Sequence, residues 1–259
     1  MGGLKLWRQQ ARLVQSASAY GAAALITVTL HEFAHGITAC FYGLRPTVYG
    51  LHEEDIASAP VSTAVIAGAG PLASLVLGLI FLAVHKRLHG QGFGRYLTLW
   101  LGLLGIAVFM GYLMTPLFYK NGDVYKVLAS LGMASPVFLG ISLLLGGIGI
   151  VQLARTGLPC LLKMTNSEVA LRPQMMALGV LAWVVGSIFV LLAMMPQRPL
   201  MLVAIGMFVP LMNLFAARRN KTEPYGEQGA EPKISLLGIG LLVALAVLEQ
   251  TVLRMGVSL

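Results

Sequence analysis

The pattern His-Glu-Phe-Ala-His occupies residues 31–35, inside the first long apolar segment of the chain. Two histidines four residues apart lie on one face of an α-helix, so His31 and His35 can reach one metal ion. Glu32, between them, can act as a general base on a metal-bound water. The alternative is a pair of interfacial histidines beside an acid. Ionisable residues in an apolar segment are costly and usually functional, which favours the metal site.

A catalytic zinc ion takes three protein ligands and leaves a fourth position for water. The chain has two aspartates, Asp55 and Asp123. Asp123 follows the third apolar segment, which runs in the same direction as the first, so both segments end on one side of the bilayer. Asp55 lies in the acidic stretch 52–55, which a solvated loop would explain. We predict Asp123 as the third ligand; the alternative is a helix N-cap or turn residue.

The composition is that of a polytopic membrane protein. Of the 259 residues, 57% are hydrophobic and 11% are charged, and the mean hydropathy is +0.81. Soluble domains carry about 25% charged residues, so these values exclude a soluble enzyme, a secreted disulfide scaffold and a disordered regulator. The net charge of +8 comes from lysines and arginines between apolar segments, where they set membrane topology. We therefore predict no nucleic-acid partner.

Seven segments are apolar and near the length needed to cross a bilayer. We predict an all-α fold of about six to seven transmembrane helices, with no cleavable signal peptide. A tight hairpin is expected at residues 196–199 and one short strand within Thr47–Leu51. Cys40 and Cys160 form no disulfide framework. The segments are about 14–42, 60–84, 97–118, 134–154, 173–195, 199–217 and 234–253, of which 134–154 is the least secure.

The distribution of basic residues predicts an orientation. If all seven segments cross, 13 of the 18 lysines and arginines fall on the side of the N-terminus. The excess of Lys and Arg marks the cytoplasmic side, so we expect a cytoplasmic N-terminus. The metal site would then lie nearer the outer face.

Three motifs together resemble the site-2 protease family of intramembrane zinc metalloproteases. They are the histidine motif at 31–35, Ala-Gly-Pro-Leu-Ala-Ser at 69–74 and Asn-Gly-Asp at 121–123. The resemblance covers about residues 20–130, the three-helix core of that family. It divides the chain into a metalloprotease core, 1–133, and additional transmembrane helices, 134–259. In that family the zinc usually lies near the cytosolic face, opposite to the side that the charge count favours.

The resemblance implies a set of site residues. Zinc would be held by His31, His35 and Asp123, with Glu32 as catalytic base. Many members have asparagine where this chain has Ser74, and Asp-Gly where it has Gly-Asp. We predict that Ser74 and Asn121 bind the substrate.

Two features are expected to be structural. Gly70, Ser74 and Gly78 are spaced four residues apart, which favours close helix packing. Glu249, near the end of the last segment, is expected to reach the interface or to pair with Arg254.

The function predicted from these residues is hydrolysis of peptide bonds within or beside the membrane, with a membrane protein or membrane-associated peptide as substrate. The alternative is a non-proteolytic membrane metalloprotein that acts in assembly, regulation or transport. A lipid oxidase built on two irons needs many more than the 5 histidines present. The sequence does not indicate an oligomeric state.

Overall fold

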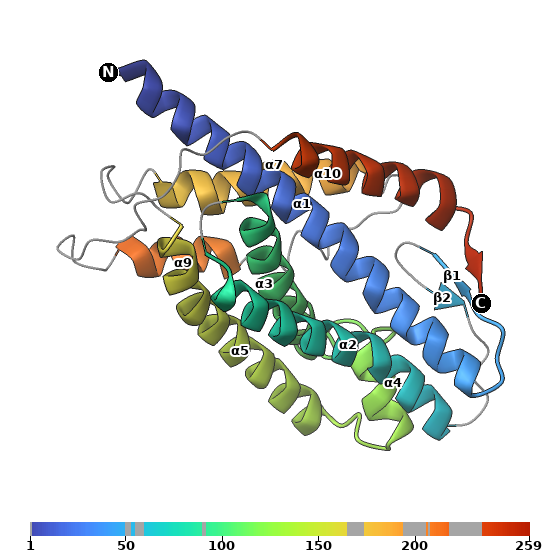
Figure 1. The fold of residues 1–259 in the computed structure, drawn as a ribbon. Helices are drawn as coiled ribbons and strands as arrows, with labels where there is room; N and C mark the ends of the chain where they lie inside the picture. Colours follow the sequence, from blue (N-terminus) through green and yellow to red (C-terminus); the bar gives the residue numbers. More distant parts are fainter. Residues whose placement is uncertain are drawn as a thin grey trace.

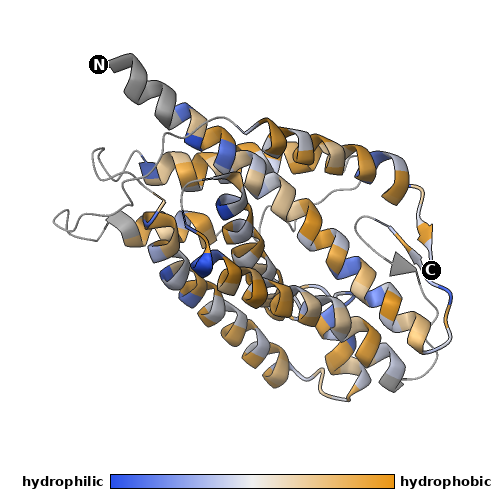
Figure 2. Ribbon diagram, in the orientation of Figure 1, coloured by the Kyte–Doolittle hydropathy of each residue, from blue (hydrophilic) through white to orange (hydrophobic). Residues whose placement is uncertain are grey.

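The computed structural model is a bundle of long helices with one small sheet at one end (Figure 1). It describes residues 2–49, 53–54, 60–89, 92–164, 174–193, 206, 208–217 and 235–259. Six helices in these ranges are long and apolar enough to cross a membrane. Hydrophobic residues run along all of them (Figure 2). The prediction of an all-α polytopic membrane protein is confirmed.

The elements follow one another along the chain with few strands. The strands are β1 (Thr47–Val48), β2 (Glu53–Glu54) and β3 (Val257–Ser258). Two π-helical segments, η1 (Met176–Leu181) and η2 (Glu249–Leu253), adjoin longer helices. The α-helices are α1 (Gly2–Phe41), α2 (Pro60–Arg87), α3 (Phe93–Met114), α4 (Asp123–Ser130), α5 (Pro136–Leu162), α7 (Ala182–Ala193), α9 (Phe208–Ala217) and α10 (Leu236–Leu248).

Helix α1 lies in the middle of the bundle and packs against α2, α3, α7 and α10. Tyr20 on α1 and Trp100 on α3 meet edge to face, with ring centroids 5.1 Å apart. Helices α2 and α3 approach closely at Gly78, which has no side chain. A Cβ there would lie only 2.7 Å from the backbone nitrogen of Ile106. The predicted small-residue packing is therefore present at Gly78.

The small sheet joins two distant parts of the chain. Its order is β2-β1-β3, with both pairings antiparallel. The predicted strand within Thr47–Leu51 is present at Thr47–Val48; residues 50 and 51 lie outside the described ranges. The partner β3 follows the last helix. It was not predicted, because a strand of two residues is too short to show an alternating pattern in the sequence.

Helices α1, α7 and α10 all run in the same direction. Near the start of α7, Ser16 Oγ donates a hydrogen bond to the carbonyl of Leu178 (2.7 Å). Near the end of α7, the Gln250 side chain donates a hydrogen bond to the carbonyl of Ala193. Helix α10 likewise ends beside β1, since β3 pairs with that strand (Figure 1). The chain must therefore return from one end of the bundle to the other between α7 and α10.

Of this return the structure describes α9, which belongs to the predicted segment 199–217. With 10 residues, α9 is shorter than the about 20 residues that cross a bilayer, and it is not one of the six candidate spans in the described part of the chain. The β1–β3 pairing places the end of α10 beside the end of α1 that leads into β1. The end of α1, the start of α4 and all three strands share one end. The predicted hairpin at 196–199 lies outside the described residues.

Glu249 differs from its prediction. Its side chain is only 5% exposed, and Thr29 Oγ1 on α1 donates a hydrogen bond to its Oε1 (2.8 Å). A buried carboxyl group needs such a partner, and α1 supplies one inside the bundle. Glu249 therefore joins α1 to η2 and does not reach the interface.

Candidate metal centre

His31, His35 and Asp123 converge on one point between α1 and the start of α4, as the sequence predicts, and form a group that could hold a metal ion. The Nε2 atoms of the two histidines are 3.2 Å apart. Asp123 Oδ2 lies 3.2 Å from Nε2 of His31 and 3.3 Å from Nε2 of His35. The three atoms form a nearly equilateral triangle. An ion about 2.0 Å from four tetrahedral ligands has ligands about 3.3 Å apart, so the triangle matches one face of such a tetrahedron.

Hydrogen bonds to the other ring nitrogens orient both histidines. His35 Nδ1 lies 2.7 Å from the carbonyl oxygen of Ile66. A carbonyl only accepts, so Nδ1 carries the proton and Nε2 of the neutral ring has a free lone pair. His31 Nδ1 is 3.0 Å from Ser74 Oγ. Such outer partners fix the ring orientation in metal sites, and here both come from α2.

Gly70 on α2 makes room for the two imidazoles. A Cβ on Gly70 would overlap Nε2 of His35 and would lie 2.7 Å from Nε2 of His31. The following Pro71 has no N–H to donate to the carbonyl four residues earlier, which loosens this turn of α2. Gly70 and Ser74, predicted to serve helix packing, also contact the histidines. The predicted packing is present at Ser74 and Gly78, since a Cβ on Gly105 of α3 would lie 2.6 Å from the carbonyl oxygen of Ser74 and 2.8 Å from Cα of Gly78.

Asp123 is the first residue of α4, which begins after the N-cap Gly122. Helix α3 ends at Met114, so the chain turns back toward α1 between Pro116 and Gly122. Burial alone would raise the pKa of Asp123, but contacts with His31 and His35 outweigh it and hold that pKa well below its usual range. Asp123 is therefore a carboxylate at neutral pH. It is both a first-turn helix residue and a partner of the histidines.

Glu32 lies on α1 between the two histidines and is 6% exposed. Its charge acts on His35 and on Tyr112, so the carboxyl group lies beside the same centre. A buried acid next to two imidazoles and a carboxylate can exchange a proton with any molecule bound there.

Tyr112 on α3 is a residue of the centre that the sequence analysis missed. Its ring stacks on His31, with centroids 4.8 Å apart and planes inclined by 16°. Its hydroxyl lies near the Asp123 carboxylate and can donate a hydrogen bond to it. One tyrosine thus touches two of the three candidate ligands. A lone tyrosine in an apolar segment carries no spacing signal, so only the tertiary structure identifies it.

Replacing Tyr112 by Phe should weaken metal binding by roughly tenfold, the lower range for partners of metal ligands. The substitution keeps the ring on His31 and removes the hydrogen bond to Asp123. Competition between the protein and a chelator for Zn²⁺ measures the change. The nearby Tyr119→Phe, on an exposed tyrosine, is the matched control. Unchanged affinity in Tyr112→Phe would show that the hydroxyl does not hold Asp123.

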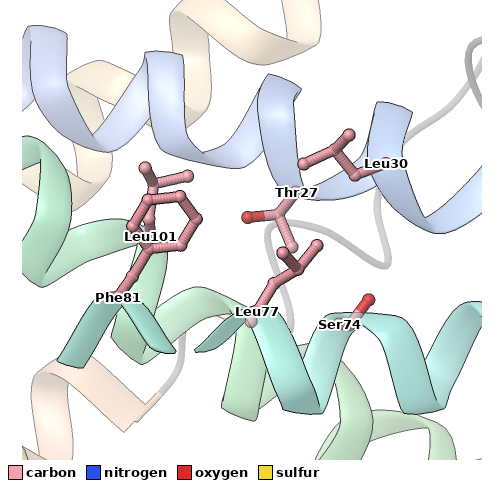
Figure 3. A pocket seen from close by; sticks show the side chains of 7 residues that line it. Thr27, Leu30, Ser74, Leu77, Phe81 and Leu101 are labelled. Atoms are coloured by element: carbon pink, nitrogen blue, oxygen red, sulfur yellow. The ribbon is translucent and has the colours of Figure 1, made fainter. Parts of the chain in front are cut away.

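An apolar pocket adjoins the centre on the side of the bundle interior (Figure 3). Its cavity volume is about 10 Å³, which is room for about one water molecule. Figure 3 shows Ser74 and Leu77 of α2 facing Thr27 and Leu30 of α1 across it. Because Ser74 also bonds His31, the pocket and the metal ligands share one wall.

The remaining residues that the sequence analysis named lie at the following places in the structure. Asn121 is exposed on the loop before α4, and its role in substrate binding stays a prediction. The same is true of Ser74, whose hydroxyl faces both His31 and the pocket. Asp55 lies outside the described residues. Cys40 and Cys160 are free, as predicted.

Comparison of the chain with protein-family models, curated proteins and solved structures finds no match.

Proposed function

We propose that the protein is an intramembrane zinc metalloprotease that hydrolyses peptide bonds of membrane proteins. One observation carries the proposal: a buried carboxyl group, that of Glu32, lies on a helix that can cross the bilayer, between two of three converging side chains that could hold a metal ion. The resemblance of the motifs at 31–35, 69–74 and 121–123 to the site-2 protease family supports it.

The donor set suits zinc. Two imidazole nitrogens and one carboxylate oxygen form a known catalytic combination that leaves a fourth position for water. The three ligand atoms lie 3.2–3.3 Å apart, and a cation between them would attract the carboxylate oxygen and the lone pairs of neutral imidazoles. Magnesium and calcium prefer all-oxygen sites, so the two nitrogens argue against them.

The side chains around the centre have separate tasks in this reaction. Bound zinc would acidify a water molecule and polarise the scissile carbonyl. The Glu32 carboxylate takes the proton of the attacking water as the oxygen–carbon bond forms. It then gives that proton to the amine nitrogen as the carbon–nitrogen bond breaks. Ser74 and the carbonyl of Ile66 keep the imidazoles in place throughout.

The surroundings favour an apolar, locally unwound substrate. The space beside Ser74 is lined mainly by aliphatic and aromatic side chains, so the centre has apolar surroundings on this side. A helical backbone hides its carbonyls in hydrogen bonds, so the substrate must unwind before it reaches the centre. Since the centre lies at the end of the bundle that carries the sheet, water can enter from that face.

Removal and return of the metal tests the proposal. The purified protein in lipid vesicles should contain about one zinc per chain and cleave single-span reporter proteins. A chelator should abolish cleavage, and one equivalent of Zn²⁺ should restore it, whereas Mg²⁺ should not. Cleavage that survives loss of the metal would contradict the proposal. Bound zinc without cleavage of any reporter would favour the non-proteolytic metalloprotein.

A further inference from the structure

Tyr112 and Glu32 approach the metal centre beside different histidines. The ring of Tyr112 stacks on His31, with centroids 4.8 Å apart, whereas the charge of Glu32 acts on His35. The two side chains are also close enough to each other for the charge of Glu32 to act on the tyrosine hydroxyl. The centre therefore has a proton acceptor on the side of His35 and a hydroxyl donor on the side of His31.

The Tyr112 hydroxyl can serve a second acceptor besides Asp123. Tyr112 lies in the last turn of α3, which ends at Met114, and its side chain is only partly buried. The hydrogen of a phenol can turn about the carbon–oxygen bond, so one hydroxyl can donate to either of two neighbouring oxygens in turn. No movement of the ring away from His31 is needed for this change of partner.

Other hydrogen-bonding groups at the centre already hold the imidazole rings. The carbonyl of Ile66 accepts from His35, and the Ser74 hydroxyl lies 3.0 Å from Nδ1 of His31. The Tyr112 hydroxyl differs from them because its neighbour is the Asp123 carboxylate. A carboxylate that shares its charge with a bound cation attracts a hydroxyl less than an oxygen on which full negative charge develops.

We propose that Tyr112 is a catalytic residue whose hydroxyl donates a hydrogen bond to the oxygen of the scissile carbonyl while that oxygen carries negative charge. This inference rests on the proposed proteolytic function. The hydroxyl keeps its own proton throughout. It leaves Asp123 as water attacks the carbonyl, and it returns when the carbon–nitrogen bond breaks and the carbonyl forms again. Glu32 moves the proton of the water, so the two side chains have separate tasks.

Tyr112→Phe tests the proposal, because it keeps the ring on His31 and removes only the hydroxyl. Zn²⁺ is supplied in excess, and elemental analysis verifies that the variant is fully loaded. Single-turnover cleavage of a saturating reporter should then fall by about 100-fold, the lower range for the loss of one such donor. The reporter concentration that gives half the maximal rate should stay unchanged. Tyr119→Phe, on the exposed loop before α4, is the matched control and should keep its rate.

Binding without turnover separates this role from a structural one. A phosphinic peptide carries a tetrahedral, negatively charged group in place of the scissile carbonyl. It should bind zinc-loaded Tyr112→Phe at least about tenfold more weakly than the unaltered protein, as expected for a mimic of the transition state. The uncleaved reporter should bind equally to Glu32→Gln and to Glu32→Gln combined with Tyr112→Phe, since its carbonyl carries no charge.

An unchanged cleavage rate in zinc-loaded Tyr112→Phe would overturn the proposal and leave the proteolytic function standing. Equal losses of affinity for the phosphinic peptide and the reporter would also overturn it, because a displaced Asp123 would weaken both. Failure of the unaltered protein to bind the phosphinic peptide would overturn it as well. If the unaltered protein cleaves no reporter, yet loss of the hydroxyl weakens only phosphinic-peptide binding, the donor is correctly assigned and the proteolytic function fails.

Discussion

Asp123→Ala should lower zinc affinity by roughly 100-fold or more, beyond the usual effect of a partner outside the ligand set, and abolish proteolysis. The carboxylate supplies the third corner of the triangle formed with the two histidines. Its loss leaves two imidazoles, which hold zinc far less tightly than three ligands. Elemental analysis after dialysis against a weak chelator measures the loss.

Asp55→Ala is the matched control, because it removes the only other aspartate of the chain. We expect zinc occupancy near that of the unaltered protein. Asp123→Asn tests charge at nearly constant size and should also bind zinc weakly. Full zinc occupancy in Asp123→Ala, or loss of zinc in Asp55→Ala, would show that the third ligand is a residue other than Asp123.

Glu32→Gln should keep zinc and lose at least about 100-fold in cleavage rate, the lower range for a general base. The amide has nearly the shape of the carboxyl group but cannot take a proton from water. The ligands of the triangle are untouched, so metal content should stay at one ion per chain. Single-turnover cleavage of a reporter, measured beside elemental analysis, separates the two effects.

Glu249→Gln is a useful comparison for this substitution. Glu249 is also a buried acid of a spanning helix, but it bonds Thr29 and lies outside the metal centre. It should retain cleavage. Unaltered turnover in Glu32→Gln would require a different base.

The sequence predicts the triangle of His31, His35 and Asp123 because regular patterns in the sequence place all three residues. His31 and His35 share a helix face through their spacing. Asp123 could be predicted to lie near them because successive apolar segments alternate in direction, so the first and third segments end on the same side of the bilayer. Helices α1 and α3 therefore deliver their ends to one side, as observed (Figure 1). Six of the seven predicted segments correspond to helices long enough to cross a membrane in the described residues, because bilayer thickness fixes helix length.

Other parts of the centre depend on contacts between segments that no local pattern records. Tyr112 becomes part of it only because α3 lies against His31. Gly70 was predicted to pack helices, and only its distance from the imidazoles distinguishes it from Gly78. The partner Thr29 of Glu249 is 220 residues away. The orientation of the bundle in the membrane stays a prediction, because the folded chain alone defines two ends and not which one is cytoplasmic.

The β1–β3 pairing has a consequence for biosynthesis. A ribosome adds about 5–20 residues per second, so the roughly 200 residues between these strands take on the order of 10–40 s. During that interval the nascent chain has α1, α2, α3 and Asp123 in place, while β1 has only β2 beside it. We therefore expect the edge of β1 opposite β2 to stay unpaired until synthesis reaches β3.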